Sequence, residues 1–310
     1  MGESVEVWSG GVNTWECDEM GHLNVRFWVA KAMEALAGLS RLMGMPDAFA
    51  SGGGATLAVR DLHMRFLREA RAGACLWASG GVIAFGETDA DLLVVLRHAD
   101  GEPAATFRIQ VDHATAGDLL PFPWPDRIRR ACAGLACEVP AFAGPRSIDL
   151  APLVQTRAGL AFAERTGMTR IGLGVVRADE LDVFGRMRPE MFIGRVSDGV
   201  ARLFGPTRPG PDAAAGDPPL RIGGAVLEYR VVHHAWPSVG DHVEVRSGFA
   251  DCTSRTRRVF HWMVDPVTGR PWASAEAVVI SFDLDARKVV DISEAAQAEF
   301  RSRAIAGIGL

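Results

Sequence analysis

Residues 15–36 read WECDEMGHLNVRFWVAKAMEAL, a short polar loop followed at once by a long apolar segment. Asn24 stands where an N-cap belongs, because its side chain can accept from the free N–H groups of a first helical turn. Apolar residues such as Phe27, Leu36 and Leu39 then recur at helical spacing. Because polar cover is scarce on both sides, the pattern predicts a helix wrapped by other elements rather than a surface helix.

The polar loop places three reactive or flexible residues directly before the helix start. These are Asp18, Gly21 and His22. Backbone N–H groups and the helix dipole favour negative charge at a helix N-terminus. A developing oxyanion would therefore be stabilised there, with a carboxylate and an imidazole nearby.

The loop occurs twice in the chain. Residues 16–21, ECDEMG, match residues 180–185, ELDVFG, and Pro189 follows the second copy at the first helical position, where proline is favoured. Two later matches extend the repeat: Arg65 falls on Arg230, and the turn 100–103 falls on 268–271. The chain therefore reads as a duplication, with halves over 5–115 and 168–285.

Each half is predicted to contain a strand, a helix and four further strands. The clearest alternating segments are 75–85, 91–98, 104–113, 242–250, 257–264 and 273–282. The proline-rich stretch 116–167 is expected to connect the halves, with short helices near 126–135 and 153–166. A helix capped by Ser293 is expected over 293–305. The predicted domains are 1–115, the connector 116–167, and 168–310.

Composition limits the classes of function. The chain has 310 residues, 48% of them apolar and 23% charged, which is typical of a globular protein. The net charge of -5 argues against nucleic acid as the main partner. Five cysteines without framework spacing indicate reduced thiols and a cytoplasmic protein. No signal peptide and no apolar run of about 20 residues is found, so no membrane segment is expected, and neither a cofactor nor a metal is expected.

The stretch D-E-M-G-H-L-N, with Asp18, Gly21, His22 and Asn24, resembles the D-x-x-G-H-x-N signature of hotdog-fold thioesterases of the 4-hydroxybenzoyl-CoA thioesterase-like superfamily. The duplicated layout is similar to the double-hotdog acyl-ACP thioesterases. The resemblance implies an α+β tandem (double) hotdog, in which an antiparallel sheet wraps a long central helix in each half. Because such a fusion already supplies a hotdog dimer, both a monomer and a homodimer of fused chains are compatible with it.

The resemblance also implies roles for individual residues. The family's catalytic carboxylate corresponds to Asp18, and the histidine and asparagine of its motif correspond to His22 and Asn24. In acyl-ACP thioesterases an asparagine between that aspartate and histidine takes part, and Met20 holds that position here.

The second copy of the loop differs in its polar residues. It keeps Asp182 and Gly185 but has Arg186 and Arg188 in place of the histidine and asparagine. Two guanidinium groups beside Asp182 are expected to hold it as a paired carboxylate, which is a weaker base and a poorer nucleophile. The arginines could instead hold the phosphates of CoA or an anionic acyl group. The Asp18 site is therefore predicted to carry turnover.

The predicted function is hydrolysis of an acyl-CoA (or acyl-ACP) thioester. Asp18 would act as general base or as nucleophile, and the helix N-terminus would form the oxyanion hole. Glu228 is a candidate second carboxylate, because residues of the opposite half complete each site in fused hotdogs. The catalytic candidates are thus Asp18, His22, Asp182 and Glu228, and the substrate-binding candidates are Gly21, Leu23, Asn24, Gly185, Arg186 and Arg188.

Two other classes of function stay open at this point. A hotdog hydratase or dehydratase usually has an aspartate five residues before a histidine, whereas Asp18 precedes His22 by four. A non-catalytic acyl-CoA-binding protein would gain nothing from a carboxylate beside the thioester carbonyl. The identity of the acyl group is not encoded in any of these motifs.

Overall fold

A computed structural model describes residues 5–204, 222–283, 285–286 and 288–310. The chain forms two compact units. The first comprises Met1–Arg146, Val176–Ile193 and Trp236–Gly240, and the second comprises Ser147–Val175, Gly194–Ala235 and Asp241–Leu310. Among the helices of the described part, none is both long enough and apolar enough to cross a membrane.

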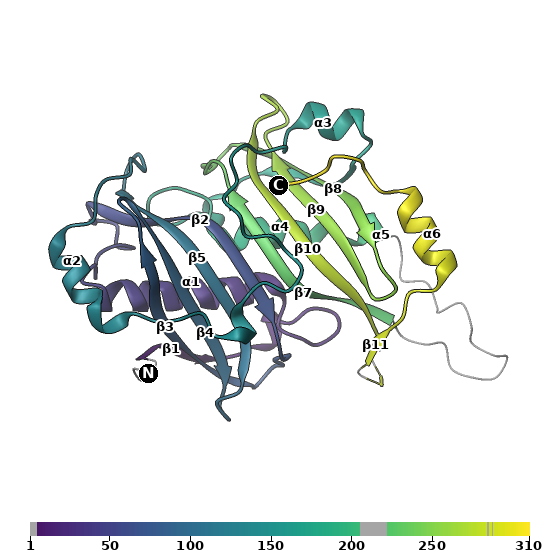
Figure 1. Cartoon of the computed structure of the whole chain (residues 1–310). Helices are drawn as coiled ribbons and strands as arrows, with labels where there is room; N and C mark the ends of the chain where they lie inside the picture. Colours follow the sequence, from purple (N-terminus) through teal and green to yellow (C-terminus); the bar gives the residue numbers. More distant parts are fainter. Residues whose placement is uncertain (1–4, 205–221, 284, 287) are drawn as a thin grey trace. The chain divides into compact units, whose positions relative to one another are not determined.

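The first unit contains one antiparallel sheet and one long helix, α1 (Val25–Leu42). The strand order is β1 (Val5–Gly11), β3 (Cys75–Phe85), β4 (Asp89–His98), β5 (Pro103–Thr115) and β2 (Ala55–Phe66). Helix α1 packs on β1, β3 and β4 and lies across the sheet in Figure 1. The predicted central helix and the predicted strands of this half are confirmed.

Burial explains why α1 forms where it does. Asn24 accepts a hydrogen bond from the N–H of Arg26 at 2.9 Å, as an N-cap does. Behind it, Val29, Leu36 and Leu39 have no exposed surface. Leu39 packs so closely over Gly80 of β3 that a Cβ at Gly80 would lie 3.3 Å from its side chain. The apolar face seen in the sequence is the core of this unit.

The second unit repeats this arrangement with a further short strand. Its order is β7 (Ile222–His233), β10 (Pro271–Asp283), β9 (Thr256–Val264), β8 (His242–Cys252) and β6 (Thr169–Val175), and β11 (Lys288–Val290) pairs with β10. Helix α4 (Pro189–Gly199) begins within the first unit and enters the second unit at Gly194. It is followed by α5 (Ala201–Phe204), which contacts β6. Helix α6 (Glu294–Ser302) packs on β8, and Ser293 caps it as predicted.

The connector is mostly irregular. It contains α2 (Asp126–Ala131), short 3-10 turns at Cys132–Leu135 and Ala141–Ala143, and α3 (Leu160–Arg165). The predicted helix near 126–135 is confirmed as α2 together with the 3-10 turn that follows it, whereas the helix predicted near 153–166 is shorter and begins at Leu160. The connector passes from the first unit to the second after Arg146. The predicted boundaries at 115/116 and 167/168 stay predictions.

Strand register corrects one detail of the repeat. Thr106 lies five residues after the glycine of the first turn and pairs with Arg65. Ser274 lies five residues after the glycine of the second turn and pairs with Val232. The predicted match of Arg65 with Arg230 is therefore wrong by two residues, because similar letters on two strands do not define their pairing.

Candidate active site

Asp18 closes the first loop with its own backbone. Its Oδ1 accepts hydrogen bonds from the N–H groups of Met20 at 3.0 Å and His22 at 3.1 Å. Its N–H donates to the carbonyl of His22 at 2.8 Å. Gly21 has φ +77°, a conformation that L side chains rarely adopt, and its N–H donates to the Asp18 carbonyl at 3.0 Å. One carboxylate oxygen of Asp18 thus has a structural role.

The other oxygen of Asp18 is available. Among the described residues, Oδ2 accepts no hydrogen bond and makes no ion pair, and the side chain is half-buried. A carboxylate with one oxygen fixed by backbone N–H groups has a defined orientation. Asp18 therefore presents an oriented oxygen that can take a proton or attack a carbonyl.

The second loop has the same backbone but a different side-chain arrangement. Asp182 Oδ1 accepts from the N–H groups of Phe184 at 2.8 Å and Arg186 at 3.0 Å, and Gly185 has φ +78°. Asp182 Oδ2, however, accepts from Arg186 Nε at 3.2 Å. Both oxygens of Asp182 are therefore occupied within the loop.

Arg188 does not join this ion pair, contrary to the expectation of two guanidinium groups beside Asp182. Its Nη1 lies 3.2 Å from Glu190 Oε1, and its Nη2 donates to the carbonyl of Asp179 at 2.9 Å. Burial raises the pKa of Glu190, and the positive charge of Arg188 opposes that rise. Arg188 is directed to Glu190 because that carboxylate is buried and needs a counter-charge.

The N-terminus of α1 offers fewer free donors than the sequence suggested. The N–H of Leu23, whose side chain is buried, donates to Ala70, and that of Asn24 donates to Glu16. The N–H of Arg26 is bound by the Asn24 side chain. Among the described residues, the N–H of Val25 is left without an acceptor in this turn. Any oxyanion at this helix end would meet that one backbone donor.

The second helix lacks this donor. Pro189 occupies the position that corresponds to Val25, as the first residue of α4. Proline has no backbone N–H. The two loops therefore differ at the main-chain donor as well as at the carboxylate.

His22 has an acidic partner that the sequence analysis missed. Its Nε2 lies 3.6 Å from Glu69 Oε2, an ion-pair distance rather than a hydrogen bond. The His22 side chain is 12% exposed and that of Glu69 is 41% exposed. Glu69 follows β2, far from the loop in sequence, and no motif marks it.

Sequence comparison assigns the chain to a family. The model of the Thioesterase-like superfamily matches residues 12–132 and again residues 176–300. The chain belongs to the Thioesterase-like superfamily. Both matches span a loop and its helix, so the family match itself contains the duplication. No curated protein sequence matches the chain.

Several solved structures of other proteins have the same fold. A Lactobacillus plantarum protein assigned as an oleoyl thioesterase has 12% identity and a TM-score of 0.67, over 90% of this chain and 97% of its own. The 12:0-ACP thioesterase of Umbellularia californica has 11% identity and a TM-score of 0.66, over 88% of this chain and 93% of its own. An acyl-ACP thioesterase of Bacteroides thetaiotaomicron has 9% identity and a TM-score of 0.60, over 88% and 96%. At these identities the likeness establishes the tandem hotdog fold alone.

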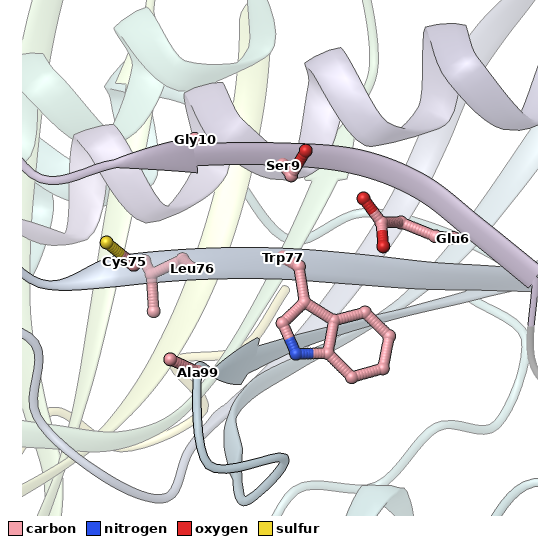
Figure 2. Close-up of a pocket in the computed structure, with 7 residues that line it drawn as sticks. All are labelled: Glu6, Ser9, Gly10, Cys75, Leu76, Trp77 and Ala99. Atoms are coloured by element: carbon pink, nitrogen blue, oxygen red, sulfur yellow. The ribbon is translucent and has the colours of Figure 1, made fainter.

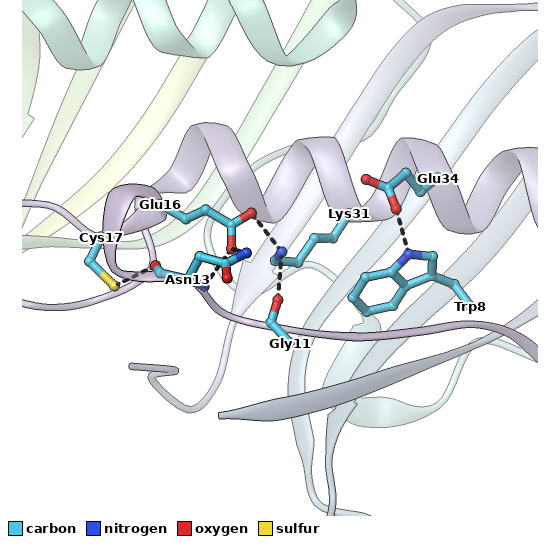
Figure 3. Close-up of polar contacts among 7 residues, drawn as sticks. All are labelled: Trp8, Gly11, Asn13, Glu16, Cys17, Lys31 and Glu34. Atoms are coloured by element: carbon cyan, nitrogen blue, oxygen red, sulfur yellow. Dashed lines mark hydrogen bonds and ion pairs between the residues drawn. The ribbon is translucent and has the colours of Figure 1, made fainter. Parts of the chain in front are cut away.

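A buried ion pair anchors the first loop to α1, as Figure 3 shows. Lys31 Nζ lies 2.8 Å from Glu16 Oε1 and donates to the carbonyl of Gly11 at 3.0 Å. The other oxygen of Glu16 accepts from the N–H of Asn13 at 2.7 Å. Glu180 of the second loop accepts from the N–H of Arg177 at 2.8 Å in the same way. The glutamate shared by the two loops is thus a structural residue.

Glu228 contacts the backbone of the connector and fixes its position. Only 1% of it is exposed, and its Oε2 accepts from the N–H of Ser147 at 2.8 Å. The neighbouring Arg230 donates to the carbonyls of Asp149 and Ala151. A catalytic role for Glu228 stays a prediction, and these contacts support a structural one.

A shallow hollow of about 340 Å³ lies elsewhere in the first unit, over the paired strands β1 and β3. Figure 2 shows its lining, which includes Glu6, Ser9, Cys75 and Trp77. No residue of either loop lines it. This hollow therefore contributes nothing to the candidate site.

Proposed function

We propose that the protein hydrolyses an acyl-CoA thioester at the first loop, with Asp18 as the catalytic carboxylate. The observation that carries this proposal is the combination of an oriented Asp18 with a free Oδ2 and an unused N–H at Val25. The second loop has neither. Membership of the Thioesterase-like superfamily supports the reaction class.

Two chemical routes are compatible with this geometry. As a general base, Asp18 would take a proton from water while the water oxygen attacks the thioester carbonyl. As a nucleophile, it would form a mixed anhydride and release the thiolate, and water would then hydrolyse the anhydride. In both routes the carbonyl oxygen becomes negative, and the Val25 N–H can stabilise it. In both, the C–S bond breaks and the thiolate of the carrier leaves and is protonated.

The remaining predicted residues have supporting roles in this proposal. Gly21 supplies the tight turn, and Asn24 holds the helix start. Leu23 and Gly185 are proposed to shape the two loops next to the acyl group. Arg186 and Arg188 are proposed to contribute positive charge toward an anionic carrier, although each already pairs with a carboxylate.

The test is a panel of acyl-CoA and acyl-ACP substrates with a thiol reagent that detects the released carrier. We expect hydrolysis of at least one acyl-CoA and a loss of about 10²–10⁴-fold in Asp18→Asn. Single turnover in ¹⁸O-labelled water separates the two routes, because only the anhydride route can leave label in the Asp18 carboxylate. Retention of activity within a few-fold in Asp18→Asn would exclude the proposed site.

A further inference from the structure

The two loops place a basic side chain at the same position but direct it to different carboxylates. His22 and Arg186 each stand four residues after the loop aspartate. Arg186 turns back and binds Asp182 at 3.2 Å. His22 instead lies 3.6 Å from Glu69. The basic residue therefore engages the loop's own carboxylate in one copy and a different carboxylate in the other.

Matching backbone hydrogen bonds show what corresponds to Glu69 in the second loop. The N–H of Leu23 donates to the carbonyl of Ala70 at 2.8 Å. The N–H of Met187 donates to the carbonyl of Pro237 at 2.9 Å. Since Leu23 and Met187 follow His22 and Arg186 directly, the segments that contain Ala70 and Pro237 are equivalent.

The residue that precedes Ala70 differs in charge from the residue that precedes Pro237. Glu69 precedes Ala70, whereas Trp236 precedes Pro237. The Trp236 ring packs edge-on against Phe192 at 5.6 Å and carries no charge. The first loop thus has a second carboxylate at the position where the second loop has an indole.

We propose that Glu69 is a positioning residue that holds the imidazole of His22 away from Asp18 and so keeps Asp18 Oδ2 free for the thioester. This inference rests on the proposed catalytic role of Asp18. A charged imidazole is attracted to either carboxylate, and the closer, better placed one retains it. The second loop shows the alternative arrangement, because there the basic group occupies the loop aspartate.

The other charged groups of the loop and its neighbours are engaged elsewhere or exposed. Glu16 is held by Lys31, and Arg68 is held by Asp100. The guanidinium of Arg26 lies 5.2 Å from the centre of the Phe27 ring. Glu19 is exposed. Glu69 lies within ion-pair distance of the His22 imidazole, and Asp18 is the carboxylate of the loop that carries His22.

The experiment compares pH–rate profiles of the parent and of Glu69→Gln. At the acidic end of the profile, where histidine side chains are protonated, His22 should turn to Asp18 in the variant, and kcat/KM should fall about 10-fold relative to the parent. At the alkaline end of the profile, where histidine side chains are uncharged, the activity of the variant should return to that of the parent. A purely structural role of Glu69 would lower activity to the same extent at every pH.

A second pair of variants tests the same inference with a permanent charge. Glu69→Gln combined with His22→Arg recreates the arrangement of the second loop, so the loss should persist at pH 8. His22→Arg alone keeps Glu69 as the partner of the basic group, so its activity at pH 8 should be clearly higher than that of the double variant. Thermal melting of each variant checks that the fold is intact.

Failure of this inference and failure of the proposed function give different results. A deficit in Glu69→Gln that does not depend on pH, or a double variant as active as the parent at pH 8, overturns the role of Glu69. An active Asp18→Asn overturns the proposed site itself. Loss of activity in Asp18→Asn together with a pH-dependent deficit in Glu69→Gln supports both.

Discussion

The two loops share a backbone conformation and an aspartate, and they differ in the groups around that aspartate. Asp18 and Asp182 each accept from two backbone N–H groups, and Gly21 and Gly185 have φ within one degree of each other. An aspartate at this position is thus required by the turn whether or not the loop is active. The loop signature therefore identifies a backbone conformation. The available Oδ2 of Asp18 and the available N–H of Val25 are what distinguish the first loop as a candidate site.

The largest expected effect separates the two aspartates. On the same substrate, Asp18→Asn should lower kcat by about 10²–10⁴-fold, because asparagine keeps the turn but cannot act as base or nucleophile. Asp182→Asn should change kcat by less than a few-fold, because that carboxylate is already bound by Arg186. If Asp182→Asn is the damaging substitution and Asp18→Asn is nearly silent, the assignment of the active loop is wrong.

The next effect concerns the ion pair that anchors the first loop. Lys31→Met leaves Glu16 charged, buried and without its partner, and removing one member of a buried pair costs about 3–5 kcal/mol of unfolding free energy. Denaturant unfolding measures this cost. The matched control is Lys31→Met combined with Glu16→Gln, which should recover part of the stability. A single variant as stable as the parent would show that the pair does not hold the loop.

A smaller effect is expected when the first helix start is made to resemble the second. Val25→Pro removes the free N–H and should lower kcat by about 10²–10³-fold, the usual loss for one oxyanion donor. The fold should tolerate the change, because proline is favoured at the first helical position and Asn24 already has φ −63° and ψ 145°. Val25→Ala keeps the N–H and serves as the control. Equal activity of the two variants would exclude this donor.

The architecture could be predicted from the sequence because its signals are local. Asn24 and Pro189 mark helix starts, and the turn glycines Gly101 and Gly269 mark hairpins, so the sequence places the helices and strands close to their observed bounds. Register was not predictable in this way. The match of Arg65 failed because strand pairing depends on partners that the strand's own sequence does not contain.

The candidate site was only partly predictable for a similar reason. Asp18 and His22 belong to one continuous motif, so the sequence shows them together. Glu69 meets His22 only through folding, because the segment after β2 docks on the loop. The number of free N–H groups at the helix start likewise depends on which carbonyls approach, and Ala70 comes from that same segment.

The smallest effect tests whether Asn24 is a cap or a catalytic residue. Its Oδ1 accepts from the N–H of Arg26, so Asn24→Ala should cost about 0.5–2 kcal/mol of stability, whereas Asn24→Ser should keep most of it. If capping is its whole role, kcat of Asn24→Ala measured well below its melting temperature stays within a few-fold of the parent. A loss of kcat in both variants, with stability kept in Asn24→Ser, would instead place the Asn24 amide among the groups that contact the substrate.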